Sequence, residues 1–180
     1  VALPNGSLIL MGGEGGAGGV NFLNDVWISN DAGVSWSLVV ENAPWAGRAG
    51  HKAFVLQGEI WLFGGGAHTI PRKLYNDVWV SGDGGRDWEL RTESAGWSAR
   101  AGMEIAIFGT DVLIMGGDHD VPVFSSAGPN FNDVWKTSDG GRTWAQVATA
   151  PWSTRTGHKC NQLQLNATVY CVGGAHQNGT

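Results

Sequence analysis

The sequence is poor in charged residues and in tyrosine, and it has no long apolar run. Asp, Glu, Lys and Arg make up 15% of its 180 residues, against about 25% in average proteins, and only 2 residues are Tyr. No apolar segment approaches the ~20 residues that cross a bilayer, and no Lys/Arg cluster marks a nucleic-acid surface. The net charge is −5. We therefore expect no membrane span and no nucleic-acid partner.

Helix-forming segments are missing as well. Good helix formers never run for ten residues without Gly, Pro or a β-branched stretch. What the sequence holds instead is 29 Gly, roughly twice the ~7% of average proteins, and 10 Trp. Abundant Gly between short apolar runs favours tight turns between short strands. The composition thus predicts an all-β protein.

An internal repeat of about fifty residues covers the chain. Asn-Asp-Val-Trp stands at 24–27, 76–79 and 132–135, and a second Trp always follows nine residues after the first. Trp-x-x-Arg-x-Gly stands at 45–50, 97–102 and 152–157. The repeats span approximately residues 1–47, 48–99, 100–154 and 155–180 of what we expect to be a single domain.

The second repeat reads as four strands. Two runs, Lys52–Leu56 and Glu59–Phe63, flank the hairpin signal Gln57-Gly58, and Val78–Ser81 and Asp87–Arg91 flank a second turn. Four antiparallel strands in about fifty residues is the period of a propeller blade. The prediction is a β-propeller of four-stranded antiparallel blades, of which about three and a half are present.

Two motifs carry a resemblance to known repeats. The double Gly after an apolar strand, the later Trp and the Arg-x-Gly-His entry resemble kelch repeats. Segments 29–36, 81–88 and 137–144 resemble the Asp-box, Ser/Thr-x-Asp-x-Gly-x-Thr/Ser-Trp, of sialidases and other secreted propellers. Asp87 and Met103 depart from these patterns. The motif positions are Asp31, Gly33 and Trp36; Asp83, Gly85 and Trp88; and Asp139, Gly141 and Trp144.

The repeated residues have a structural and a functional interpretation. We expect the three Asp-box aspartates to accept hydrogen bonds from turn backbone, and the alternative is calcium binding or acid catalysis. Arg48, Arg100 and Arg155 are expected to bridge neighbouring blades, with the Asp of Asn-Asp-Val-Trp as a candidate partner. The alternative is an arginine cluster for a carboxylate substrate, as in sialidases.

Candidate ligand sites lie after the double glycines. His68, His119 and His176 could be proposed as metal ligands, but neighbouring blades would separate their loops, so we expect no metal site and no cofactor. A galactose-oxidase-like copper site needs two Tyr ligands and a Cys crosslink, and a sialidase needs a Tyr nucleophile. No set of residues here matches either, and no catalytic residue is predicted.

The two cysteines and three sequons indicate the secretory route. In the second repeat, partners across the first hairpin have numbers that sum to 115, and the same alignment gives 331 in the last repeat, so Cys160 faces Cys171 and a disulfide is expected. Asn5, Asn166 and Asn178 begin N-glycosylation sequons, the first two at equivalent hairpin tips. An extracellular or secretory location follows.

The expected function is that of a non-enzymatic, secreted glycoprotein propeller, acting as a structural or interaction module in an extracellular assembly or filament. The alternative is part of a carbohydrate-active enzyme, sialidase-like or galactose-oxidase-like, whose catalytic residues lie outside this chain. We expect that the chain does not close a ring alone. Its partners are then the remaining blades of a longer polypeptide or other chains, with carbohydrate as a candidate ligand.

Overall fold

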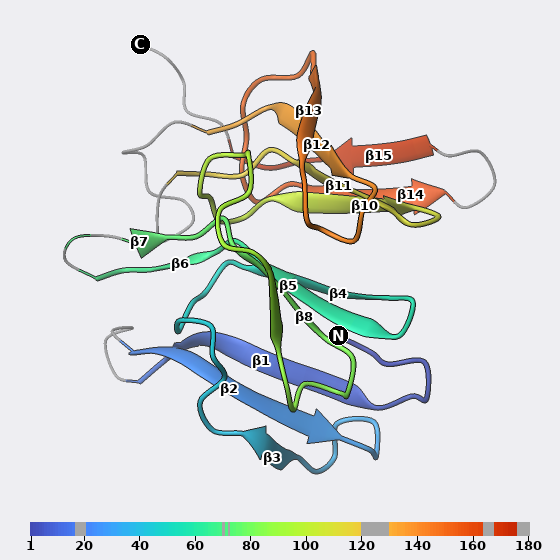
Figure 1. Cartoon of the computed structure of the whole chain (residues 1–180). Coiled ribbons are helices and arrows are strands. Elements are labelled where there is room, and N and C mark those ends of the chain that lie inside the picture. The colour runs from blue at the N-terminus through green and yellow to red at the C-terminus, as the bar shows by residue number, and fades with distance from the viewer. Residues whose placement is uncertain (17–20, 70, 72, 120–129, 164–167, 176–180) are drawn as a thin grey trace.

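The computed structural model of the chain describes residues 1–16, 21–69, 71, 73–119, 130–163 and 168–175. Within these ranges the regular structure is β-strand, arranged in four successive antiparallel sheets and one short ribbon (Figure 1). In this part of the chain, no helix has the length and apolar character needed to cross a bilayer. The expected all-β class is confirmed.

The sheets follow one another in the order of the sequence. The first sheet holds β1 (Leu8–Gly15), β2 (Asn21–Ser29) and β3 (Ser37–Val40). The second holds β4 (Lys52–Leu56), β5 (Glu59–Phe63), β8 (Val78–Ser81) and β9 (Glu89–Thr92). The third holds β10 (Glu104–Phe108), β11 (Asp111–Met115), β12 (Asp133–Thr137) and β13 (Ala145–Thr149), and the fourth β14 (Lys159–Leu163) and β15 (Thr168–Val172).

Three of the four strands predicted in the second repeat begin and end where expected. Gln57 and Gly58, with φ of 52° and 84°, reverse the chain so that β4 and β5 pair in the predicted register. The fourth strand starts at Glu89 instead of Asp87. The backbone N–H of Asp87 donates to the carboxylate of Asp83 at 3.0 Å, which keeps Asp87 in the turn.

The connections after the double glycines differ from the prediction, which treated them as loops. In the first sheet, β1 and β2 remain paired as far as Gly15 and Asn21. In the second, β6 (Gly66–Ala67) and β7 (Lys73–Leu74) form a two-stranded ribbon. Backbone pairing needs no side chains, so these Gly-rich strands carry no alternating pattern by which a sequence reveals a strand.

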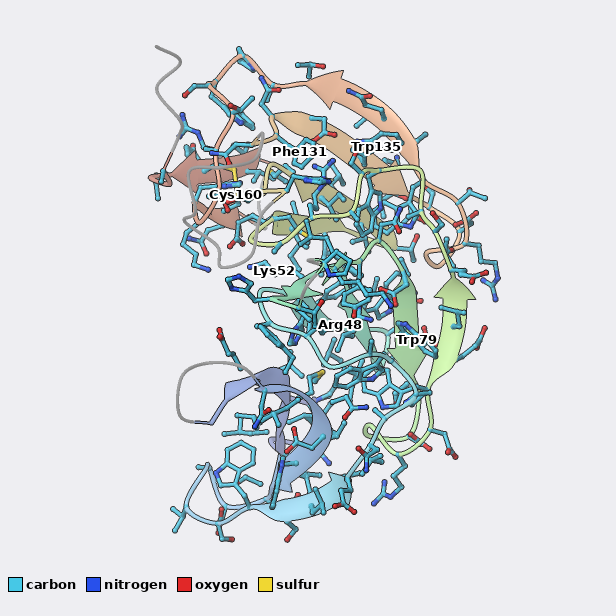
Figure 2. The ribbon with its side chains drawn as sticks, turned by 90° about the vertical axis from the view of Figure 1, so that its left-hand side faces the viewer. Arg48, Lys52, Trp79, Phe131, Trp135 and Cys160 are labelled. Atoms are coloured by element: carbon cyan, nitrogen blue, oxygen red, sulfur yellow. A yellow bond between two sulfur atoms is a disulfide. The ribbon has the colours of Figure 1, made fainter. Side chains whose placement is uncertain are left out.

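Successive sheets pack face to face in an arc (Figure 2), and an apolar layer fills each interface. Between the first and second sheets, Ile9, Met11 and Val26 meet Ile60 and Leu62. Leu62 is fully buried there. Alternate residues of each strand face opposite neighbours, so each inner sheet is apolar on both faces.

Aromatic rings dominate the next interface, between the second and third sheets. Phe63 packs edge-on against Trp144 with ring centroids 5.9 Å apart, and Trp97 packs edge-on against Trp144 at 6.0 Å. Edge-to-face pairs of this kind stabilise by about 0.5–1.5 kcal/mol beyond their buried area. Of the repeated tryptophans, Trp45, Trp97 and Trp144 are therefore core residues of the sheet interfaces.

A glycine that follows the second strand of one sheet makes room for the residue just before the first strand of the next sheet. A Cβ on Gly64 would lie 2.3 Å from the Met103 side chain, and one on Gly116 would lie 2.5 Å from the His158 ring. Both glycines also have positive φ, 64° and 63°. Met103 thus occupies the place that His158 takes one sheet later, which explains why this departure from the repeat pattern is tolerated.

The predicted disulfide between Cys160 and Cys171 is confirmed. The two residues are direct partners in the pairing of β14 with β15, with a Cα–Cα distance of 4.1 Å. Both sulfurs contact the sulfur of Met115 in the third sheet, at 3.6 and 3.5 Å. The crosslink therefore also packs against the preceding sheet.

Of the three sequon asparagines, Asn5 is described, and Asn166 and Asn178 lie outside the described residues. Asn5 is exposed in the turn between Val1–Leu3 and β1. Val1 and Ile9 exchange backbone hydrogen bonds of 2.7 and 2.8 Å, so the first residues extend the first sheet as a short fourth segment.

Removal of the disulfide should loosen the fourth sheet selectively. The bond closes a loop with a sequence separation of 11, and a loop of this size stabilises by about 2–3 kcal/mol. We expect a Cys160→Ser/Cys171→Ser variant to lose amide exchange protection in β14 and β15 before the other strands. Reductant should reproduce the effect in the native chain and do nothing to the variant. Equal protection in both proteins would contradict this.

Candidate functional site

The three motif aspartates bind the turns in which they lie. Asp31 accepts hydrogen bonds from the backbone N–H of Ser35 and the hydroxyl of Ser29, both at 2.8 Å. Asp139 accepts from the backbone N–H of Thr143 at 3.0 Å and from its hydroxyl at 2.6 Å. Each carboxylate thereby satisfies turn donors that would otherwise need water.

These bonds keep the three carboxylates ionised. Hydrogen bonds from Ser35 lower the pKa of Asp31 to about 2. Burial opposes the shift at Asp139, but the bonds from Thr143 outweigh it and its pKa is also about 2. The pKa of Asp83 is lowered too, against its burial. A general acid must hold its proton near the working pH, so these aspartates are unsuited to acid catalysis at neutral pH.

Two repeated arginines form buried clamps between sheets. Arg48 is fully buried and donates to both carboxylate oxygens of Asp77, at 2.5 and 2.8 Å, and to the carbonyl of Gly64. Its backbone N–H donates to the carbonyl of Leu23 in the first sheet. The main chain of Arg48 is therefore bonded to the first sheet and its side chain to the second. Figure 2 labels Arg48 near the centre of the molecule.

Arg100 repeats this arrangement one sheet later. It is fully buried and donates to both oxygens of Asp133, at 2.5 and 2.8 Å, and its backbone N–H donates to the carbonyl of Tyr75. Its guanidinium lies 3.8 Å from the ring centre of Phe131, as that of Arg48 lies 4.1 Å from Tyr75. The hypothesis of Arg–Asp bridges is confirmed for these two arginines.

Arg155, the third member, has a different environment. It donates to the carbonyl of Gly173 at 2.9 Å and to Ser153, and it is only partly buried. The three arginines lie at successive sheet junctions, so the structure does not bring them together into one carboxylate-binding cluster.

A charged cluster on the first strands of three sheets was missed by sequence reasoning. Glu104 is 6% exposed and accepts from Lys52 at 2.7 Å and from Lys159 at 3.0 Å. Burial would raise the pKa of Glu104, but the bonds from Lys52 and Lys159 outweigh this effect and lower the pKa. The only signal in the sequence is that all three residues follow the same repeat position and alternate in charge. The cluster ties β4, β10 and β14 together.

The structure describes two of the three candidate metal ligands. His68 and His119 are exposed, and His176 lies outside the described residues. Among the residues that the structure describes, no group of three or more His, Cys, Asp and Glu side chains could hold a metal ion. Of two other histidines, His158 is fully buried and His51 is partly buried. Burial, with the nearby Arg48, lowers the pKa of His51 to about 4, and burial also lowers the pKa of His158.

Comparisons with known proteins give a fold and no family. No family model matches the chain. Among solved structures, one titled "Structure of YjhT" superposes with a TM-score of 0.79 at 18% identity. The match covers 98% of this chain and 58% of that one. The chain thus spans little more than half the length of the protein it matches, and at this identity the likeness concerns the fold alone.

Loss of one clamp should strongly destabilise the fold. Arg100→Ala leaves the Asp133 carboxylate largely buried without its guanidinium, which should cost about 3–5 kcal/mol of unfolding free energy. Chemical denaturation measures this, and Arg86→Ala, which removes a bond to the turn carbonyl of Asp83, is the control with little effect. An Arg100→Met/Asp133→Asn variant should recover part of the loss. A single variant as stable as the parent would contradict the clamp.

The Arg100–Asp133 pair also makes the stability of the fold depend on pH. Burial would raise the pKa of Asp133, but hydrogen bonds from Arg100 outweigh this effect and lower the pKa below its ordinary value. A lowered folded pKa contributes stability above the unfolded value of about 3.9, and this is lost as pH falls through the folded value. Below about pH 4 the native chain should therefore lose stability more steeply than Asp133→Asn, as measured by denaturation at each pH.

Proposed function

We propose that the four sheets are blades of a β-propeller with kelch-type repeats and Asp-box hairpins. Each sheet corresponds to one sequence repeat, and the same Arg–Asp clamp joins the first to the second and the second to the third. The arc in Figure 2 turns in one direction, as a propeller requires. The likeness at TM-score 0.79 to a longer chain supports an architecture with more blades than these.

The module acts in assembly and not in catalysis. In the described part of the chain, the Asp-box aspartates are engaged by their turns, Arg48 and Arg100 by Asp77 and Asp133, and Glu104 by Lys52 and Lys159. A catalytic site needs residues that differ from one blade to the next, whereas these recur in register. This argument favours a structural or interaction role over the carbohydrate-active alternative.

The observation that carries the proposal is an uncovered apolar face at each end of the arc. Tyr170 and Val172 on the last strand are 56% and 64% exposed. At the other end, Leu10 is 51% exposed, whereas Leu62, one repeat later, is fully buried by the preceding sheet. Proteins cover such faces with another sheet. The partners are therefore further propeller blades, in a longer polypeptide or in other chains.

A secretory location fits the disulfide and the sequons. Disulfides persist in oxidising compartments, and the exposed turn position of Asn5 accepts a bulky glycan. The glycoprotein character of the proposal depends on this route.

Self-association through the last face tests the assembly role. We expect the 180-residue chain to form oligomers at tens of micromolar in light scattering, and Tyr170→Lys/Val172→Lys to shift it towards monomer because buried Lys would lose its hydration. Val147→Lys is the matched control, since Val147 is 52% exposed on the edge strand β13. A native chain that stays monomeric, or a double variant that associates equally, would overturn the proposal. Hydrolysis of glycans by the native chain would favour the enzyme.

Glycan attachment tests the compartment. A chain secreted by eukaryotic cells should carry an N-glycan on Asn5, detected by glycopeptide mapping, and Asn5→Gln should lower the intact mass by one glycan. Asn42, exposed but outside any sequon, is the internal control and should be unmodified. An unmodified Asn5 in secreted material would count against the secretory assignment.

A further inference from the structure

In the part of the chain that the structure describes, Asp77 and Asp133 each bind an arginine, whereas Asp25, the aspartate of the first Asn-Asp-Val-Trp segment, does not. It stands on β2 where Asp77 precedes β8 and Asp133 begins β12, and its Oδ2 accepts the indole N–H of Trp27 at 2.7 Å. Its other carboxylate oxygen, Oδ1, is buried and has no hydrogen-bond partner. A buried, unsatisfied carboxylate oxygen is costly, so this position calls for a donor.

The surroundings of Asp25 match those of the occupied clamps. Leu23 takes the place of Tyr75, on which the Arg48 guanidinium stacks, and is itself 40% exposed. Leu23, Asp25 and Trp27 line an open hollow of about 680 Å³ on the first sheet. In the second sheet the corresponding space is filled by the fully buried Arg48. The hollow therefore has the position and the charge to take a guanidinium.

A second aromatic partner is missing beside the first sheet. Trp88 packs edge-on against Trp45 with ring centroids 5.8 Å apart, and Trp144 packs in the same way against Trp97. In each pair the second Trp lies three residues before the clamp arginine. Trp36 is the repeat equivalent of Trp88 and Trp144, and it is 39% exposed, against 9% for Trp144.

We propose that Asp25 and Trp36 mark a binding site for a Trp-x-x-Arg segment of another propeller blade. The arginine donates to Asp25 and packs against the aliphatic Leu23, and the tryptophan packs edge-on against Trp36. An arginine is required because its planar fork reaches both carboxylate oxygens, as Arg48 does at Asp77. The inference deepens the proposed function and rests on it, since it specifies how a preceding blade attaches.

The chain itself offers a ligand that can be attached in register. Val1 pairs with Ile9 as Phe54 pairs with Trp61 one repeat later, so Val1 holds the position of Phe54. Fusing a copy of residues 43–53 directly ahead of Val1 therefore places Trp-x-x-Arg where the repeat geometry requires it. The matched control carries Gln in place of the arginine of that extension.

We expect the arginine extension to lower the unfolding equilibrium constant about tenfold relative to the Gln extension, the size of one charge-assisted hydrogen-bond pair. Asp25→Asn should abolish the difference, and Asp111→Asn, which removes an ion pair with Lys136 on the third sheet, should preserve it. The indole N–H resonances of Trp27 and Trp36 should shift with the arginine extension only. These resonances report binding even where stability changes little.

Equal stability of the two extended chains, with unchanged indole resonances, would overturn the site. Trp36 and Trp27 resonances that move on simple dilution of the unextended chain would identify the Trp-x-x-Arg segment at 152–155 of a second copy as the one bound here. The experiment is independent of the fourth sheet. A failure here with intact self-association through Tyr170 and Val172 rejects only this site, whereas the reverse result rejects the assembly role.

Discussion

The buried Arg–Asp clamp is the interaction on which the arrangement of the sheets depends. The main chain of the arginine is hydrogen-bonded to one sheet and its side chain to the next. This one residue therefore fixes both the distance and the rotation between the two sheets. A fully buried guanidinium tolerates little displacement, because every donor that moves away from Asp77 or a carbonyl leaves an unpaired charge in the interior. The apolar layers supply most of the attraction between sheets but no such direction.

Much of the fold could be predicted from the sequence because the same pattern of strands and turns recurs along the chain. The turn at Gln57-Gly58 fixes the register of its hairpin, and transfer of that register along the repeat located the pairing of Cys160 with Cys171. What could not be predicted are features without a side-chain pattern, such as the paired extension to Gly15 and the ribbon at Gly66.

The candidate site followed a similar division. The clamps were predicted because Arg and Asp recur at fixed positions of the repeat. The sequence contains three such arginines and three such aspartates. It could not show that Arg48 pairs with the aspartate that follows it, Asp77. In the part of the chain that the structure describes, this offset leaves Asp25 without an arginine and Arg155 without an aspartate. That offset by one sheet is a property of the three-dimensional path of the chain.

The cluster around Glu104 has a consequence for the order of the sheets. Repeats that share the same clamps and the same tryptophans are interchangeable in their apolar layers, and such chains are prone to swap or misalign equivalent units during folding. At the first residue of β4, β10 and β14, however, the charges are positive, negative and positive. A sheet out of sequence would place two ammonium groups next to each other, or would leave the buried Glu104 carboxylate without a lysine. The alternation of charge therefore distinguishes sheets that are otherwise similar.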